Sequence, residues 1–127
     1  MWSLTLALVT FDLLDIQGAR HTNSEIAGQS SVLLFVSATC PLSARAAPEI
    51  NRLYNDFSPR GIKFFAVYAE TVRETPHAFT SLLDPAQTLA RQTGATATPQ
   101  AIVISEKGAV VYRGRIDDRS IDRKSVV

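Results

Sequence analysis

The chain contains 127 residues, of which 46% are hydrophobic and 20% are charged, and its formal net charge is +1. These values are typical of one soluble globular domain, so we treat residues 1–127 as a single domain that can bury a core without disulfides or metals. The charges form no basic stripe, which argues against nucleic acid as a partner. With one cysteine and two well-separated histidines, the sequence predicts no internal disulfide, no metal site and no cofactor.

The N-terminal part reads as an extended segment followed by a hairpin. Residues 1–9 are apolar but short, and they carry neither a basic leader nor an Ala-x-Ala cleavage pattern. We therefore expect neither a signal peptide nor a stable membrane span. An opening strand over residues 5–14, a turn at 15–18 and a return arm at 19–22 are predicted, followed by one helical turn that ends at Gly28.

The middle of the chain alternates buried strands with helices. Residues 32–36 are continuously apolar, which predicts a central strand covered on both faces. Helical spacing then begins after Cys40 and continues through Pro48 to a stop at residues 58–61. The apolar residues of this helix that share one face are Ala46, Ile50, Leu53 and Phe57. Residues 62–69 read as a second buried strand.

Beyond the second strand, residues 70–81 look irregular, and Leu82 with Leu83 forms a minor apolar patch. Asp84 followed by Pro85 predicts the N-cap and first position of a helix that ends at Gly94. Residues 101–104 and 109–113 form an antiparallel hairpin around a turn at 106–108, and the tail from Asp117 is charged. The order strand, helix, strand, helix, strand, strand predicts an α/β fold with helices on both faces of a mixed sheet.

Cys40 is the chemically most informative residue. It lies between a buried strand and a helix, where unpaired backbone N–H groups and the helix dipole favour an anion. The thiolate, the nucleophilic form of cysteine, is therefore favoured over the thiol, and Pro41 fits the first helical position. A lone cysteine can also be an inert small hydrophobe, but the strand-to-helix junction favours reactivity.

Ser43 occupies the place of the second cysteine in a Cys-x-x-Cys site. Its hydroxyl can donate a hydrogen bond to the thiolate, but it cannot resolve a mixed disulfide. Arg45, five residues after Cys40, is a candidate for added positive potential. The sequence thus predicts a monothiol site that needs an external thiol to complete turnover.

These features resemble a known family. The runs 35–43 and 48–50, the Ala97-Thr98-Pro99 segment before a strand, and the run 112–119 resemble thioredoxin-like proteins. The similarity is greatest to bacterial redoxins related to alkyl hydroperoxide reductase and thiol-specific antioxidant proteins. It implies a three-layer α/β/α thioredoxin-like fold with a C-terminal hairpin, a nucleophilic Cys40, and a cis-proline at Pro99. The substrate-positioning residues it implies are Thr39, Pro41, Thr98 and Pro99.

The sequence also departs from that family. Leu33 and Ser37 stand where a typical peroxiredoxin has a proline and a threonine, and Leu34 stands where thioredoxin has a buried acid. The stretch between Tyr68 and Leu82 is shorter than in related redoxins, where a further helix is expected.

Other polar residues have plainer interpretations. Glu70 is a candidate for proton transfer or electrostatic assistance, but a solvated surface carboxylate is the plainer interpretation. We expect His77 on the surface, residues 117–118 paired with arginines, and the C-terminal arginines on an edge strand and its exit. These arginines are Arg113, Arg115 and Arg119.

Three functions follow from the sequence. The first is thiol-disulfide exchange through Cys40, with a thiol- or disulfide-bearing protein or a small-molecule thiol as partner. The second is a one-cysteine hydroperoxide reductase that passes through a sulfenic acid. The third is a non-catalytic binding domain. Copper delivery is disfavoured because no second soft ligand is available. The resemblance leaves the compartment open between bacterial cytoplasm and periplasm.

Overall fold

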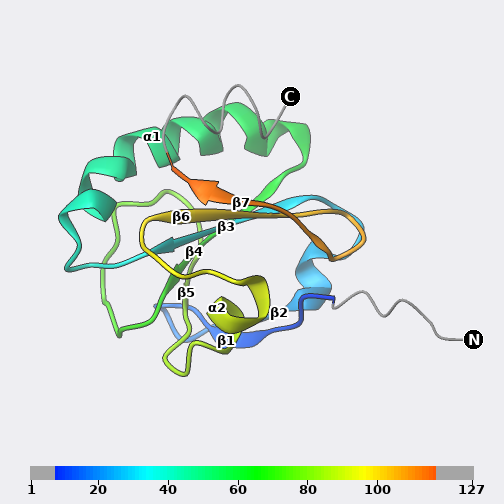
Figure 1. Cartoon of the computed structure of the whole chain (residues 1–127), viewed down its shortest axis with the longest axis horizontal. Coiled ribbons are helices and arrows are strands. Elements are labelled where there is room, and N and C mark those ends of the chain that lie inside the picture. Colours follow the sequence, from blue (N-terminus) through cyan, green and yellow to red (C-terminus); the bar gives the residue numbers. More distant parts are fainter. Residues whose placement is uncertain (1–7, 117–127) are drawn as a thin grey trace, which may run out of the picture.

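The computed structural model describes residues 8–116, so residues 5–7 of the expected opening strand and the tail from Asp117 lie outside the described residues. This part of the chain contains two α-helices, seven strands and two short 3-10 helices (Figure 1). In chain order they are β1 (Asp12–Leu14), β2 (Arg20–Thr22), η1 (Asn23–Ile26), β3 (Ser31–Val36), α1 (Pro41–Phe57), η2 (Ser58–Arg60), β4 (Lys63–Tyr68), β5 (Ser81–Leu83), α2 (Thr88–Thr93), β6 (Gln100–Ile104) and β7 (Val110–Arg115).

A five-stranded mixed sheet forms the centre, in the order β5-β4-β3-β6-β7. β3 is parallel to β4, and β4 is parallel to β5, while β6 runs antiparallel to both β3 and β7. All six residues of β3 are buried, as its apolar run predicts. The predicted C-terminal hairpin is confirmed, as is the antiparallel pairing of β1 with β2.

Two apolar clusters cover the two faces of the sheet. On one face, Leu34, Ala66 and Ala101 pack with Ile50 and Leu53 of α1. The opposite face is covered by β1, β2, η1 and α2 (Figure 1), and its cluster includes Leu33, Phe65, Ile102 and Leu89. Alternate residues of each strand supply the two clusters, because successive side chains of a strand point to opposite faces. The predicted three layers are confirmed.

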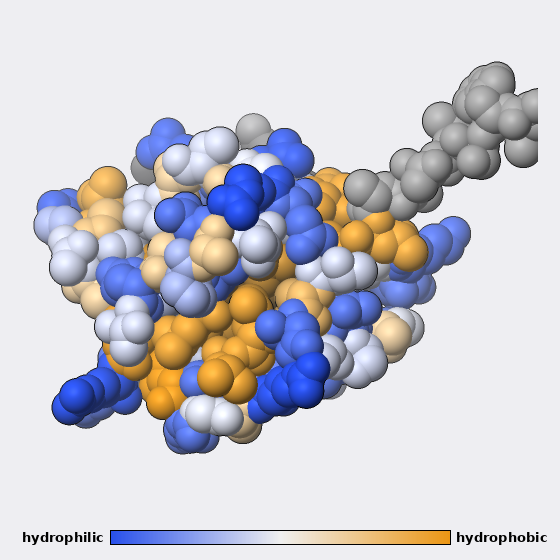
Figure 2. Space-filling view, turned by 90° about the horizontal axis from the view of Figure 1, so that it is seen from below, coloured by the Kyte–Doolittle hydropathy of each residue, from blue (hydrophilic) through white to orange (hydrophobic). Residues whose placement is uncertain are grey.

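The face that carries β1 and α2 is closed only by short elements. Seen from this side, apolar surface shows between hydrophilic side chains (Figure 2). Leu8 and Leu14, near the start of the described part, are 54% and 52% exposed. Within residues 8–116, no helix combines the length and the apolar character that crossing a membrane requires.

Helix α1 begins and ends as its sequence dictates. Cys40 is the N-cap, Pro41 occupies the first position, and the helix continues through Pro48. Proline at the first position costs no hydrogen bond, because that N–H has no partner inside the helix. The helix ends at Phe57, and the chain turns at Gly61, whose φ of 87° suits glycine.

Two expectations about the segment from residue 70 to residue 94 are wrong. Leu82, taken as a minor apolar patch, belongs to strand β5, which pairs with the end of β4. The second helix begins at Thr88 rather than directly after Asp84. The intervening residues turn instead, since the Gln87 N–H donates to the Asp84 carbonyl at 2.9 Å and Gln87 has a φ of 57°.

Asp84 still serves the N-terminus of α2 across this turn. Its carboxylate accepts hydrogen bonds from the Leu89 N–H at 3.3 Å, the Ala90 N–H at 3.1 Å and the Thr88 hydroxyl at 3.2 Å. The side chain is 2% exposed. It therefore satisfies backbone donors that a helix N-terminus would otherwise leave unpaired.

Candidate functional site: a lone thiol facing a cis-proline loop

Cys40 lies where β3 passes into α1, with the cis Thr98–Pro99 peptide bond close by. Its thiol donates a hydrogen bond to the carbonyl oxygen of Thr98, with an S–O distance of 3.7 Å. Cys40 is partly buried, and it is the free cysteine of the described chain. The geometry therefore places the thiol against an exposed backbone segment from a distant part of the sequence.

The surroundings of Cys40 favour the thiolate. The backbone N–H of Ser43 contributes most to lowering the pKa of the Cys40 thiol below its ordinary value of 9.0. Burial opposes this, but the Ser43 hydroxyl, the Leu42 N–H and the side chain of Thr98 lower the pKa further. Ser43 and Leu42 belong to the first turn of α1, where N–H groups favour an anion, whereas Thr98 comes from the loop before β6.

Ser43 has a second role besides its bond to Cys40. The side chain is buried, and its Oγ accepts a hydrogen bond from the Ser37 N–H at 3.1 Å. Ser37 belongs to the loop that joins β3 to α1. One hydroxyl thus connects the thiol with the loop that precedes it.

The loop of the cis-proline is held by a residue that sequence reasoning missed. The Oε1 atom of Gln100, the first residue of β6, accepts hydrogen bonds from the Thr96 N–H at 2.8 Å and the Ala97 N–H at 3.4 Å. These bonds fix the backbone on the approach to Thr98. The sequence signal was slight: an amide side chain directly after Pro99.

Glu70 lies on the opposite side of the thiol loop, two residues after β4. Its Oε2 accepts hydrogen bonds from the Ser37 hydroxyl and the Ala38 N–H, both at 3.0 Å. The pKa of Tyr68 is raised to about 12, mainly by burial and in addition by the nearby charge of Glu70. Glu70 is thus bound to the thiol loop and is not a freely solvated carboxylate.

Three further predicted site residues are exposed. Thr39 and Pro41 are exposed on either side of Cys40, and Thr39 is tied back by its N–H, which donates to the Ser37 Oγ at 3.3 Å. Arg45 is exposed on α1, and it is not among the groups that lower the pKa of Cys40.

Two grooves flank Thr98. One, of about 480 Å³, runs between the thiol loop and α2, and Ser37, Glu70 and Thr98 are among its lining residues. The other, of about 590 Å³, lies between α1 and the end of β7, where Arg45 and Arg115 contribute to its walls. A chain laid across Thr98 would therefore have open space on both sides.

Two of the three C-terminal arginines lie on strand β7. Arg113 of β7 uses its Nε–H to donate to the carbonyl oxygen of Thr93 at 2.9 Å, at the end of α2. Arg115 is exposed on the same strand, as expected. Arg119 and residues 117–118 lie outside the described residues.

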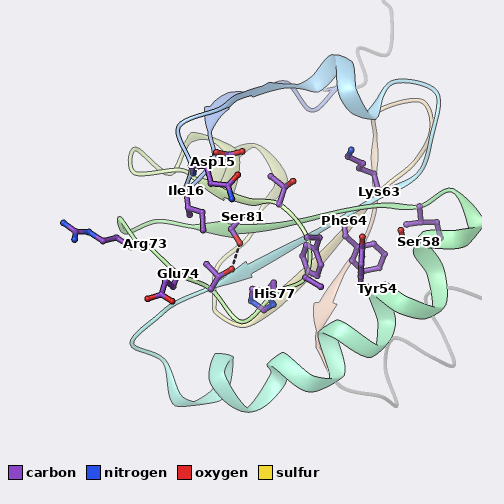
Figure 3. Close-up of a pocket in the computed structure, with 16 residues that line it drawn as sticks. Asp15, Ile16, Tyr54, Ser58, Lys63, Phe64, Arg73, Glu74, His77 and Ser81 are labelled. Atoms are coloured by element: carbon purple, nitrogen blue, oxygen red, sulfur yellow. Dashed lines mark hydrogen bonds between the residues drawn. The ribbon is translucent and has the colours of Figure 1, made fainter.

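A larger groove of about 690 Å³ lies away from Cys40, between α1, the 73–80 loop and β4 (Figure 3). His77, expected on the surface, is instead half-buried here and stacks on Phe79 with 5.4 Å between ring centroids. Its burial follows from aromatic packing, which the loop sequence did not reveal. Thr75 and Ser81 close one wall through hydroxyls 3.0 Å apart. Cys40 is not among the lining residues.

A second histidine lies in a cluster that the sequence did not predict. His21 contacts Asp15 through Nε2 at 2.7 Å and Glu25 through Nδ1 at 2.9 Å. Burial lowers the pKa of His21, but the hydrogen bonds to Glu25 and Asp15 outweigh it, so the pKa is raised above 6.5. No group of three His, Cys, Asp or Glu side chains within residues 8–116 is arranged to hold a metal ion.

The arrangement of strands and helices is the thioredoxin fold. It matches the exposed lipoprotein thioredoxin Etrx1 of Streptococcus pneumoniae strain TIGR4 with a TM-score of 0.74, over 90% of this chain and 96% of that one, at 16% identity. It matches DsbF from MTB with a TM-score of 0.77, over 94% and 96% of the two chains, at 22% identity. At such identities the likeness shows the fold alone.

The chain belongs to the AhpC/TSA family, whose model matches residues 6–113, and this confirms the resemblance drawn from the motifs. It is also similar to the thiol-disulfide oxidoreductase ResA of Halalkalibacterium halodurans, with 26% identity over 111 residues. That alignment covers 81% of this chain but 63% of the relative, so the chain spans less than two thirds of its length.

Proposed function

We propose that this chain is a monothiol oxidoreductase that exchanges thiols and disulfides through Cys40. The observation that carries the proposal is the position of the thiol, at the N-terminus of α1 and facing the carbonyl of Thr98 at 3.7 Å. Helix N–H groups favour its anion, and the Thr98 segment offers backbone groups for a partner strand. The similarity to ResA supports the same chemistry.

The reaction balances with two external thiols. The Cys40 thiolate attacks a partner disulfide, forming a Cys40–partner mixed disulfide and releasing one partner sulfur as a thiolate, which takes up a proton. An external thiolate then attacks the Cys40 sulfur and releases the second partner thiolate. A second external thiolate displaces Cys40 and leaves the external pair as a disulfide. Two electrons pass from the external thiols to the partner.

External thiols are needed because residue 43 is a serine and not a second cysteine. Its hydroxyl lowers the pKa of Cys40 but cannot form a disulfide with it. The partner class is a disulfide- or thiol-bearing protein or a small-molecule thiol, and Thr39, Pro41, Thr98 and Pro99 are its positioning residues.

The direct test uses glutathione disulfide and mass spectrometry. The reduced protein is expected to gain one glutathionyl group that excess thiol removes, and Cys40→Ser is expected to gain none. Ser43→Cys is expected to expel the group by forming an internal disulfide, and to reduce insulin faster than the parent. A parent that gains no group, or a Cys40 that is alkylated with the pH dependence of a free thiol, contradicts the proposal.

The same samples test the alternatives. Cys40-dependent loss of hydrogen peroxide in a thiol recycling system, without a mixed disulfide, would assign the chain to the one-cysteine peroxidases. The hydroxyl of Ser37, at the place of the peroxiredoxin threonine, is instead engaged by Glu70 and Thr39. An inert Cys40 in both assays would indicate a binding domain.

A further inference from the structure

The loop of residues 37–39, between β3 and α1, buries little of its own surface. Ala38 and Thr39 are exposed, and Ser37 is half-buried. Ordering such a loop costs conformational entropy, so its geometry depends on the hydrogen bonds that hold it. The Cys40 N–H donates to the Ser37 carbonyl at 3.3 Å, which ties the position of the nucleophile to that of Ser37.

Ser37 is held from two directions. From the helix, the Ser43 Oγ accepts its N–H. From the segment just after the neighbouring strand β4, the Glu70 Oε2 accepts a hydrogen bond from the Ser37 hydroxyl, and the same oxygen accepts one from the Ala38 N–H. Hydrogen bonds to a carboxylate are stronger than those between neutral groups. Glu70 lies 32 residues or more from these partners in sequence, so it attaches the loop to a different part of the sheet.

We propose that Glu70 is a positioning residue for Cys40: it fixes the Ser37–Ala38 backbone so that the thiol faces both the start of α1 and Thr98. This deepens the proposed function and rests on it. Glu70 acts through hydrogen bonds rather than through its charge or a proton. It touches Ser37 and Ala38 rather than Cys40, and it is not among the groups that shift the pKa of the thiol.

An electrostatic role and a positioning role of Glu70 predict opposite changes in the pKa of the Cys40 thiol. If Glu70 acted through its charge, removing that charge would favour the thiolate, because a nearby anion disfavours a second one. If it positions the loop, Glu70→Ala weakens the contacts of Cys40 with Ser43, Leu42 and Thr98, so the pKa of Cys40 rises. Glu70→Gln keeps an acceptor oxygen for both donors and should retain most of the wild-type behaviour.

The experiment compares Glu70→Ala, Glu70→Gln and Glu74→Ala. Glu74→Ala removes the same charge from an exposed position in the following loop, and so serves as a matched control. Two readouts are taken: the pH midpoint of Cys40 alkylation by iodoacetamide, and the rate of mixed-disulfide formation with glutathione disulfide. Thermal unfolding establishes that each variant is folded at the assay temperature.

For Glu70→Ala we expect the alkylation midpoint to move upward and mixed-disulfide formation to slow by about tenfold or more, since misplacing a reacting group by an ångström costs up to about 100-fold. Glu70→Gln and Glu74→Ala should stay close to wild type. A downward midpoint in Glu70→Ala, equal losses in both Glu70 variants, or no loss in either would overturn the proposal. Alkylation of Cys40 needs no disulfide partner. If the wild-type protein fails to form a mixed disulfide, the alkylation midpoints of the variants therefore still test whether Glu70 positions Cys40.

Discussion

The sulfur of Cys40 lies 3.7 Å from the carbonyl oxygen of Thr98, although the two residues are 58 positions apart in the sequence. β3 and β6, the strands next to these residues, are antiparallel neighbours in the sheet. The end of β3 therefore meets the start of β6 at one edge. The thiol is brought to the cis-proline loop by the register of two strands rather than by local sequence.

Ser43→Ala is expected to raise the pKa of the Cys40 thiol and to slow its alkylation at neutral pH. The variant loses the side-chain hydrogen bond but keeps the Ser43 N–H, which is the larger stabilising contact, so the pKa should stay below that of a free thiol. It also leaves the Ser37 N–H without its acceptor, which costs about 1 kcal/mol of stability.

The measurement is the iodoacetamide alkylation rate against pH, with Ser58→Ala at the far end of α1 as control. Ser58 is remote from the thiol along the helix, so its loss should leave the alkylation midpoint unchanged. An unchanged or lowered midpoint in Ser43→Ala would show that the hydroxyl does not stabilise the thiolate.

Asp84→Ala is expected to destabilise the fold by about 2 kcal/mol, the upper end for a lost helix N-terminal acceptor, because the carboxylate is buried and serves three donors. Asp84→Asn should be intermediate, since one oxygen remains. Urea unfolding measures both, with Asp56→Ala on exposed α1 surface as the comparison. Equal losses for Asp84→Ala and Asp56→Ala would contradict the assignment.

Gly94→Ala is expected to cost more than Gly61→Ala. Both glycines have a positive φ, 80° and 87°, so each alanine pays about 1–2 kcal/mol for the left-handed conformation. A Cβ at Gly61 meets nothing within 4 Å, whereas at Gly94 it would lie 2.8 Å from the Nε of Arg113. Arg113 would have to move and lose its bond to the Thr93 carbonyl.

A double-mutant cycle isolates this collision. In an Arg113→Ala background, Gly94→Ala should cost no more than Gly61→Ala does, as measured by urea unfolding. If the excess cost of Gly94→Ala persists without Arg113, the collision is not its source.

Sequence patterns predicted the elements whose signals are local and long. The five apolar residues 32–36 of β3 and the helical spacing after Cys40 are clear local signals, and the ordered motifs placed Cys40 and Pro99. Strand β5 was not predicted because three residues are too few to show a periodic pattern. It is defined by its pairing with Ala66, Val67 and Tyr68 of β4. Asp84 was recognised as a cap, but the turn at Gln87 displaced the helix start.

The features of the site that were not predicted are tertiary contacts. Gln100 was not predicted, and Glu70 was a candidate whose hydrogen bonds to backbone no local pattern reveals. A carboxylate after a strand looks the same in sequence whether it is solvated or bound. The same is true of His21, whose partners come from the β1–β2 turn and from η1.

His21 gives the stability of the fold a defined pH dependence. Its pKa is raised in the folded state, so the charged imidazole stabilises the fold fully below the ordinary value of 6.5, and this contribution is lost as pH rises through the folded pKa. For Asp15, burial opposes the hydrogen bond from His21, but the pKa is lowered overall, so its contribution is lost as pH falls below 3.8. The stability advantage of wild type over His21→Gln should therefore be largest in mildly acidic solution and shrink as pH rises above 6.5 and through the raised pKa of the folded state.

His77→Gln provides a control of opposite sign. Burial lowers the pKa of His77, so the neutral ring is favoured in the fold and its contribution is full above 6.5 and lost as pH falls. Urea unfolding across this pH range should show the wild-type advantage over His21→Gln falling with pH, while the advantage over His77→Gln rises. A His21→Gln difference that is constant or grows with pH would mean that the imidazole is held neutral between Asp15 and Glu25, and that these contacts are hydrogen bonds rather than ion pairs.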